Sequence, residues 1–150
     1  MMQVLSPCPG RTFPITEVSD PVFAAEMVGP GVAIEPLPEP TTVVAPVAGT
    51  IVKLHPHAFA MATADGLGVL VHLGIDTVRL DGAGFELLAG EGAVVAAGAP
   101  MVSWNPAAIS AGGLEATVMV VALDRPASSL SDVVTGRDVA AGEPLFTVDA

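Results

Sequence analysis

Apolar residues come in short bursts from Phe13 onward, separated by glycine, proline and small polar residues. Bursts of this length between turn-forming residues are typical of short β-strands. Few stretches favour a helix. FELLAG (85–90) predicts one short helical turn, and NPAAISAGG (105–113) predicts another that begins with Asn105 as N-cap and Pro106 as first helical residue. We therefore expect an all-β fold with at most short helical turns.

The length of 150 residues fits one domain. The proline-containing segment 1–12 is expected to be a flexible N-terminal tail, with a single domain over 13–150. Within that domain, residues 92–101 (GAVVAAGAPM) match residues 136–145 (GRDVAAGEPL) at a constant offset of 44, and both lead into a β-type run. Two copies are too few for a solenoid, so the repeat predicts a sandwich of two similar halves.

The chain is strongly acidic, with a formal net charge of −11 at pH 7 and only five Lys and Arg residues. A phosphate backbone and an anionic membrane surface would both repel this charge, so we expect no nucleic-acid binding. The acidity either keeps an apolar-rich chain in solution or matches partners that carry basic patches.

Cysteine usage and the N-terminal sequence bear on the compartment. Cys8 is the only cysteine, which excludes an internal disulfide and suits a reducing environment. The start of the chain lacks the charged and long apolar regions of a signal peptide, and no apolar run is long enough to span a membrane. We expect a cytoplasmic protein that does not insert into the membrane.

The three histidines, His55, His57 and His72, lie within 18 residues of one another. Asp65-Gly66 between them predicts a hairpin with a type I′ turn, which pairs residues whose numbers sum to 131. His72 then lies opposite position 59 and diagonal to His57, and a two-residue slip places the two histidines directly opposite. In either register both project from the same face of the sheet, where opposed or diagonal side chains meet.

Two adjacent imidazoles have a definite chemistry. Two positive rings repel each other, which keeps at least one ring neutral near pH 7. A neutral ring nitrogen is a nucleophile, and its neighbour can donate a hydrogen bond to the anion that is attacked. Neutral imidazoles also suit zinc, and a histidine on a half-buried strand can simply be structural.

Four segments resemble a known family, the glucose-family enzyme IIA component (EIIA) of the bacterial phosphoenolpyruvate-dependent sugar phosphotransferase system. The resemblance covers nearly the whole chain from Phe13, and the block VHLGIDTV with a HAF histidine 15 residues upstream is specific. The segments are VVAPVAGTIVKL (43–54), HAFAM (57–61), GVLVHLGIDTVRLDGAGF (68–85) and EGAVVAAGAPM (91–101).

The resemblance implies a compact antiparallel β-sandwich and a phosphotransferase activity. His72 would accept a phosphoryl group from the phosphocarrier protein HPr and pass it to a cysteine of a IIB domain of a sugar permease, which couples sugar uptake to sugar phosphorylation. His57 would stabilise the phosphoryl group. Asp76 matches an acidic residue beside the site, and it can equally be a turn-forming aspartate.

The resemblance also implies a shallow apolar depression around the site. An apolar rim would exclude water from the labile P–N bond and let one face dock different partners. The candidate rim residues are Val44, Phe59, Leu70 and Val78, of which Val44 and Phe59 can equally be ordinary core. Gly74 is a further candidate, because it allows close backbone approach.

No cofactor is expected for the free protein, and family members can share a zinc ion with a partner's carboxylate through the equivalents of His57 and His72. The chain departs from the family at His55, where many members have a threonine that hydrogen-bonds the supporting histidine. His55 either replaces that donor or points to solvent, and we expect it to point to solvent.

Three other functions compete. A zinc-dependent lysostaphin-like endopeptidase would use the H-x-H pair His55-Pro56-His57, but it also needs a ligand pair upstream, and His72 and Asp76 follow instead. A biotinyl or lipoyl carrier needs a lysine at a hairpin tip, whereas Lys53 lies inside TIVKL. A IIA protein that acts mainly as a regulatory surface, with partners that sense phosphorylated His72, is indistinguishable here from one that serves transport. The sugar is not encoded in this chain.

Overall fold

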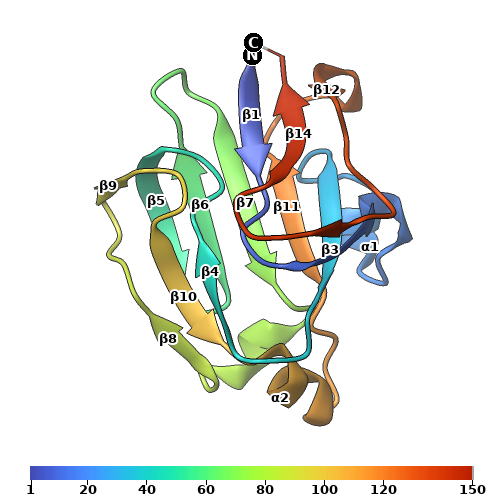
Figure 1. The fold of residues 1–150 in the computed structure, drawn as a ribbon, viewed down its shortest axis with the longest axis vertical. Coiled ribbons are helices and arrows are strands. Elements are labelled where there is room, and N and C mark those ends of the chain that lie inside the picture. The colour runs from blue at the N-terminus through green and yellow to red at the C-terminus, as the bar shows by residue number, and fades with distance from the viewer. Residues whose placement is uncertain (150) are drawn as a thin grey trace.

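The computed structural model describes residues 1–149 and consists mainly of short antiparallel strands (Figure 1). The expected all-β fold is confirmed. The strands are β1 (Met2–Leu5), β2 (Gly10–Pro14), β3 (Gly31–Pro36), β4 (Thr41–Val44), β5 (Gly49–His55), β6 (Ala58–Ala62), β7 (Gly68–Leu73), β8 (Phe85–Leu87), β9 (Val94–Val95), β10 (Pro100–Trp104), β11 (Val118–Ala122), β12 (Leu130–Ser131), β13 (Asp138–Val139) and β14 (Pro144–Val148). The helices are α1 (Pro21–Ala24) and α2 (Pro106–Ala111), with 3₁₀ turns η1 (Ile15–Glu17), η2 (Thr77–Leu80) and η3 (Ala127–Ser129).

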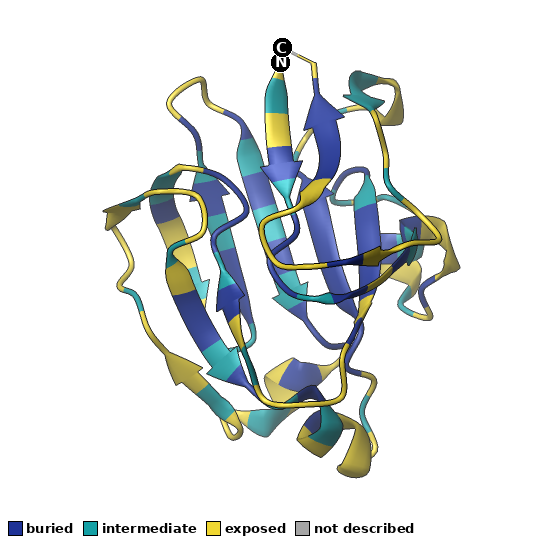
Figure 2. Cartoon of the chain, in the orientation of Figure 1, coloured by how far each residue is buried: buried dark blue, intermediate teal, exposed yellow. Residues whose placement is uncertain are grey.

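One large sheet and two small sheets form the sandwich. The large sheet has the strand order β13-β2-β3-β11-β7-β6-β5-β9, and the small sheets have the orders β1-β14-β12 and β4-β10-β8. The main core lies between them. Figure 2 shows β11 and β14 as largely buried, β7 as alternating between buried and intermediate residues, and β8 as largely exposed. Within residues 1–149, no helix has the length and apolar character needed to cross a bilayer.

The large sheet is covered on both faces at its centre. Val69, Val71 and Leu73 of β7 point into the main core, as the two-residue period of a strand requires. On the opposite face a second apolar cluster forms, which includes Met119 of β11 and Phe23 of α1. This outer cluster places an apolar environment around the alternate residues of β7, among them His72.

The predicted repeat corresponds to two similar halves. Gly98 N donates to Ala45 O at 2.9 Å, and Gly142 N, 44 residues later, donates to Ser6 O at 2.8 Å. Gly98 and Gly142 have φ values of 89° and 90°, a left-handed conformation that favours glycine at both positions. The repeat was therefore a correct sign of internal duplication.

The two halves also bind each other reciprocally through their first strands. Leu5 N donates to Pro46 O, and Val44 N donates to Pro7 O, each at 2.9 Å. The segment SPCPG near the N-terminus is thus the counterpart of APVAG in the second half.

The prediction of a flexible tail over residues 1–12 is wrong. Strand β1 pairs with β14 in the register Met2↔Val148, and residues 10–12 belong to β2. Val4 and Cys8 are completely buried in the main core. The prolines of this segment end and turn the chain between two strands, and they do not loosen it.

The helix predictions were partly correct. Helix α2 begins at Pro106, and the side chain of its N-cap Asn105 accepts a hydrogen bond from Ala107 N at 3.1 Å, as predicted. FELLAG is not a helical turn, because Phe85–Leu87 forms the edge strand β8 beside β10. Helix α1 was missed, although Asp20-Pro21 repeats the same N-cap and proline pattern.

The N-terminal strand makes a testable contribution to stability. We expect Val4→Ala to lower the free energy of unfolding by about 2 kcal/mol, because it removes two methyl groups from a fully buried position. Gln3→Ala, at the neighbouring exposed position, is the control and should change it by less than about 0.5 kcal/mol. Urea unfolding measures both, and equal small effects would mean that β1 is not part of the packed core.

Candidate functional site

The site is centred on His72, which lies on β7 with its side chain on the outer face of the large sheet. Its ring is partly buried, and the ring centroid lies 5.3 Å from that of Phe23 and 5.2 Å from that of His57. Leu70, two residues earlier on the same face, packs against the outer cluster. His72 is the last residue but one of β7, and this C-terminal end of the strand points away from the chain termini (Figure 1).

The hairpin between β6 and β7 has a different turn from the one predicted. Gly66 N donates to Thr63 O, and Thr63 N donates to Leu67 O, each at 2.9 Å. Three residues therefore form the loop, with Gly66 at φ 86°, as in a type I turn followed by a glycine bulge. The extra loop residue shifts the register by one, so that Ala58, not Phe59, lies opposite His72.

His57 reaches His72 from a turn and not from a strand. Pro56 and His57 form the two-residue connection between β5 and β6, and His57 O accepts a hydrogen bond from Leu73 N at 2.7 Å. The rings of His57 and His72 meet edge to face at 74°. The predicted adjacency is confirmed, but the predicted register was wrong, because His57 lies beyond the paired part of β6.

One hydrogen bond fixes the tautomer of His72. Its Nδ1 lies 2.7 Å from the carbonyl oxygen of Gly74. A carbonyl oxygen can only accept, so Nδ1 carries the proton and Nε2 keeps its lone pair when the ring is neutral. Gly74 has φ 84° and is buried, which turns its carbonyl back toward the ring.

The environment keeps both rings neutral. Burial lowers the pKa of His72 below its ordinary value of 6.5, while the Gly74 hydrogen bond and the charges of Asp20 and Asp76 act in the opposite direction. Burial also lowers the pKa of His57, and the neighbouring rings of His72 and His55 add to this effect. For His72, the effect of burial on the pKa is thus larger than the opposite effect of the nearby carboxylates.

Asp76 and His55 surround this pair. Asp76 is exposed, adopts a left-handed φ of 61° and precedes η2, so its turn-forming role is evident and its charge acts on His72 from a distance. His55 is exposed, and its ring stacks on His57 with a centroid separation of 6.0 Å and an angle of 25°. The expectation that His55 only points to solvent was therefore incomplete.

The candidate rim residues do not all lie at the site. Val78 on η2 is 63% exposed and follows Asp76 closely, so it is available as a rim residue. Phe59 is 1% exposed and lies in the main core, so it is a core residue and not a rim residue. Val44 lies on β4 in a different sheet, where it pairs with Pro100.

Sequence reasoning missed Phe23 and Asp20. Helix α1 carries Phe23 onto the ring of His72, and Asp20 caps the helix by accepting a hydrogen bond from Val22 N at 2.9 Å. The N-cap and proline pattern of Asp20-Pro21 was the available signal. That pattern predicts a helix start, but no local feature shows that the helix folds back onto β7.

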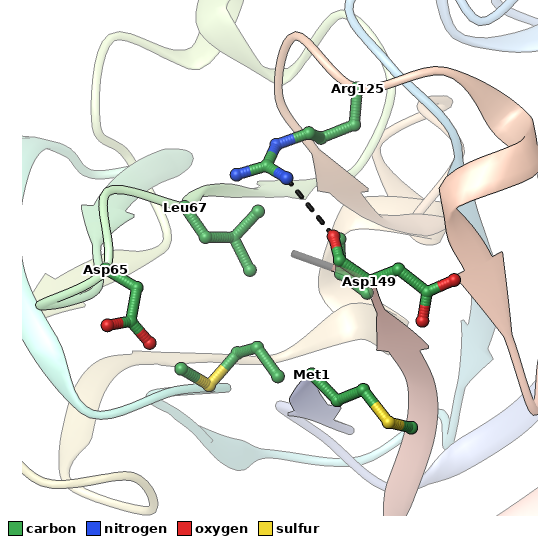
Figure 3. Close-up of a pocket in the computed structure, with 7 residues that line it drawn as sticks. Met1, Asp65, Leu67, Arg125 and Asp149 are labelled. Atoms are coloured by element: carbon green, nitrogen blue, oxygen red, sulfur yellow. Dashed lines mark hydrogen bonds between the residues drawn. The ribbon is translucent and has the colours of Figure 1, made fainter.

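A pocket of about 120 Å³ lies near the chain termini, and no histidine lines it (Figure 3). Leu67 and Asp65 line one side of it, and Arg125 donates a hydrogen bond to the backbone oxygen of Asp149 at 3.2 Å. Its charged side chains come from the β6–β7 loop (Asp65), the segment after β11 (Arg125) and the C-terminal end (Asp149). His72 lies instead near the C-terminal end of β7, the end opposite the β6–β7 loop.

The histidines do not form a ready-made metal centre by themselves. Among residues 1–149, no three or more His, Cys, Asp and Glu side chains are grouped so that they could hold a metal ion. His55 stacks parallel to His57, which differs from the convergence of two ligands on one ion.

Known proteins resemble this chain in sequence and in fold. It is 35% identical over 150 residues to the glucose-specific EIIBCA component of the phosphotransferase system (PTS) of Corynebacterium glutamicum, covering 99% of this chain and 22% of that protein. It is 41% identical over 104 residues to the PTS glucose-specific EIIA component of Staphylococcus aureus, covering 68% of this chain and 61% of that protein. The chain thus spans about a fifth of the length of the first relative.

A solved structure agrees over almost the whole fold. Glucose permease IIA from Mycoplasma capricolum superimposes with a TM-score of 0.88 at 33% sequence identity, covering 97% of this chain and 94% of that one. The sequence profile described as phosphoenolpyruvate-dependent sugar phosphotransferase system, EIIA 1, matches residues 2–127. The chain belongs to this family of phosphotransferase-system EIIA domains.

Proposed function

We propose that this domain is a phosphotransferase component that accepts a phosphoryl group on His72 Nε2 and passes it on. The observation that carries the proposal is the hydrogen bond from Nδ1 to Gly74 O, which leaves Nε2 as the free nucleophile beside a second imidazole. Membership of the EIIA family supports the same reaction class.

The transfer needs little covalent help from the protein. His72 Nε2 attacks phosphorus of a phosphohistidine on the donor, for which the family resemblance supports HPr. The new P–N bond forms as the donor's P–N bond breaks. The electron pair of the broken bond stays on the donor's imidazole. As Nε2 gives up electron density, the Nδ1–H bond becomes more polar, and the Gly74 carbonyl stabilises the ring.

The second transfer goes to a cysteine. A thiolate of a IIB domain attacks phosphorus, an S–P bond forms, and Nε2 of His72 leaves as a neutral imidazole with its Nδ1 proton in place. Relatives named EIIBCA and EIICBA carry IIA together with IIB in one chain, which supports a IIB partner. The thiolate is the reactive form of cysteine, so no proton needs to move within this domain.

His57 is proposed to stabilise the phosphoryl group during its transfer. Its ring meets His72 edge to face, so a ring N–H can donate to a phosphoryl oxygen bound on Nε2. The neutral form suffices for this, which agrees with its lowered pKa. The hydrogen bond from His57 is strongest when negative charge spreads over the phosphoryl oxygens during transfer. Loss of His57 should therefore lower the rate of phosphoryl transfer more than the fraction of His72 that carries phosphate.

The surroundings of the ring suit docking of two successive protein partners. Val22 and Met27, on and just after α1, are 42% and 74% exposed, and Val78 lies exposed on η2. Asp20 and Asp76 add negative charge to this apolar surface. Such a surface fits partners with an apolar patch and basic residues, because the apolar contact excludes water and complementary charge speeds encounter.

Two further aspects belong to this proposal. The two imidazoles can supply two of the four ligands of a zinc ion, so a zinc site shared with a partner would need that partner's carboxylate. A cytoplasmic location also belongs to the proposal, and the free thiol of Cys8 suits a reducing compartment.

The protonation of the two rings can be measured by NMR. We expect His72 and His57 to titrate with midpoints below 6.5, because burial disfavours the charged form of each. His72→Gln should raise the midpoint of His57, since it removes a like charge, and should leave it below 6.5 because desolvation is the larger cause. A His72 midpoint at or above 6.5 would show that the charges of Asp20 and Asp76 affect its pKa more than burial does.

The same shifts make stability depend on pH. Below pH 6.5 the unfolded chain takes up protons on these rings more readily than the folded chain, so the free energy of unfolding should fall as pH drops through the folded-state pKa values. Urea unfolding of the wild type and of His57→Gln/His72→Gln between pH 7.5 and 5 measures this loss. The double variant should lose less stability over that interval.

The phosphoryl acceptor is tested with phosphoenolpyruvate, enzyme I and HPr. We expect one acid-labile phosphate per chain in the wild type and none in His72→Ala. In His57→Ala, acceptance should persist while onward transfer to a IIB domain falls about 100-fold, the scale of losing one donor to a developing oxyanion. Measured rates of both half-reactions distinguish the two roles.

His55→Ala provides a control at the end of β5, next to the same turn. This variant retains the rings of His57 and His72 and should still be labelled with phosphate. Labelling that survives in His72→Ala would contradict the proposed function.

A further inference from the structure

The backbone of Leu73 and Gly74 is the most densely bonded part of the site. Leu73 N donates to His57 O at 2.7 Å, and Gly74 N donates to Thr117 O at 2.9 Å. Gly74 O accepts from His72 Nδ1. Leu73 N and Gly74 O thus contact the two histidines, and the peptide unit between them consists of Leu73 C=O and Gly74 N–H. Its N–H is bonded to Thr117, so its carbonyl, that of Leu73, needs a partner of its own.

Thr77 supplies that partner. Its side chain is 1% exposed, and its Oγ1 donates to Leu73 O at 2.6 Å. Thr77 lies at the start of η2, so the bond closes the loop that leads from β7 through Asp76. A short bond from a buried hydroxyl restrains the plane of the peptide between Leu73 and Gly74, because a rotation of that plane would leave two buried polar groups without partners.

The methyl group of Thr77 restrains the same turn. A Cβ at Gly74 would collide with Thr77 Cγ2 and would lie 2.9 Å from Glu115 O. The left-handed turn of Gly74 is thus packed against the Thr77 side chain on one side and against the β11 approach on the other. The Gly74 carbonyl lies in the next peptide unit, whose N–H, on Ile75, donates to Glu115 O at 2.9 Å. Thr77 holds the peptide before Gly74 and Glu115 the peptide after it, so the Gly74 carbonyl has little freedom to turn away from His72.

We propose that Thr77 is a positioning residue for phosphoryl transfer: by holding the Leu73–Gly74 peptide and packing against Gly74, it restricts the backbone rotation at Gly74 that aims the carbonyl of the next peptide unit at His72. That carbonyl keeps the proton of His72 on Nδ1 and the lone pair on Nε2. The inference rests on the proposed function for its consequence in rate. Its structural content, the tautomer of His72, stands independently of that function.

The tautomer matters because a neutral imidazole has one proton and two nitrogens. If the Gly74 carbonyl moves away, the Nδ1–H form loses its acceptor and the Nε2–H form becomes populated. A protonated Nε2 has no lone pair to attack phosphorus. The fraction of chains ready to accept phosphate would fall in proportion, without loss of any residue that touches the phosphoryl group.

The test compares Thr77→Val with Thr77→Ser. Valine keeps the shape of threonine and removes the hydroxyl, whereas serine keeps the hydroxyl and removes the methyl group. Two-dimensional ¹⁵N NMR of the imidazole rings reads the tautomer of His72 directly, without any phosphoryl donor. We expect Thr77→Val to shift His72 measurably toward the Nε2–H form, and Thr77→Ser to retain the Nδ1–H form.

The rate of phosphate acceptance is measured in parallel. We expect it to fall about tenfold in Thr77→Val, the scale of one lost hydrogen bond, and to recover in Thr77→Ser. Thr77→Ala is studied alongside, so that a tautomer shift is still readable if the valine variant folds poorly.

Thr12→Val is the matched control. Thr12 is also buried, and its Oγ1 donates to a backbone carbonyl, that of Arg137, at 3.2 Å on strand β2, three strands away from β7. It should cost stability and leave the tautomer of His72 unchanged.

The outcomes separate the two proposals. If wild-type His72 accepts phosphate while Thr77→Val and Thr77→Ala keep the wild-type tautomer and rate, the role of Thr77 is overturned and the proposed function stands. If Thr12→Val shifts the tautomer as much as Thr77→Val does, the effect is a general loss of stability and the inference is likewise overturned. Labelling that persists in His72→Ala overturns the proposed function alone, because the tautomer measurement needs no phosphate.

Discussion

The bond from His72 Nδ1 to the carbonyl of Gly74 decides what the site can do. A partly buried imidazole without it would exchange its proton between two nitrogens, and either could face an incoming group. With this bond, Nδ1 donates its proton to the backbone and Nε2 keeps its lone pair. The geometry needs a strand that ends at His72, a left-handed residue two positions later, and a buried loop that returns the carbonyl to the ring.

Burial and charge act on this ring in opposite directions, and burial prevails. The outer apolar cluster removes water from His72, which favours the neutral form. Asp20 and Asp76 lie close enough to favour the charged form, but not enough to reverse the sign. Both carboxylates can therefore lie near His72 while its ring stays neutral.

The duplicated architecture gives the site its two flanks. In the first half, β2 leads into η1 and α1, which place Phe23 on one side of the His72 ring. In the second half, β5 leads into a two-residue turn, which places His57 beside the same ring. Equivalent strands thus end in different connections, and both connections converge on one residue of β7. The reciprocal bonds between Leu5, Pro46, Val44 and Pro7 hold the halves in the register that makes this convergence possible.

The sequence by itself determined the strand content, the internal duplication, the start of α2 and the chemical type of the site. These follow from local patterns: residue spacing, a proline after an N-cap residue, and three histidines close together in a chain whose motifs resemble a known family. It failed where one residue of loop length mattered, because Asp65-Gly66 fits either a two-residue or a three-residue loop and only packing on both faces selects between them.

Tertiary structure alone decided which groups meet. The pairing of β1 with β14, the burial of Phe59, and the positions of Phe23 and Thr77 around β7 involve segments that are distant along the chain or that turn back through the core. No local propensity encodes such contacts, since each is stabilised only when the other sheet or loop is already in place. The histidines were visible in the sequence, whereas the carbonyl that orients one of them became visible only in the fold.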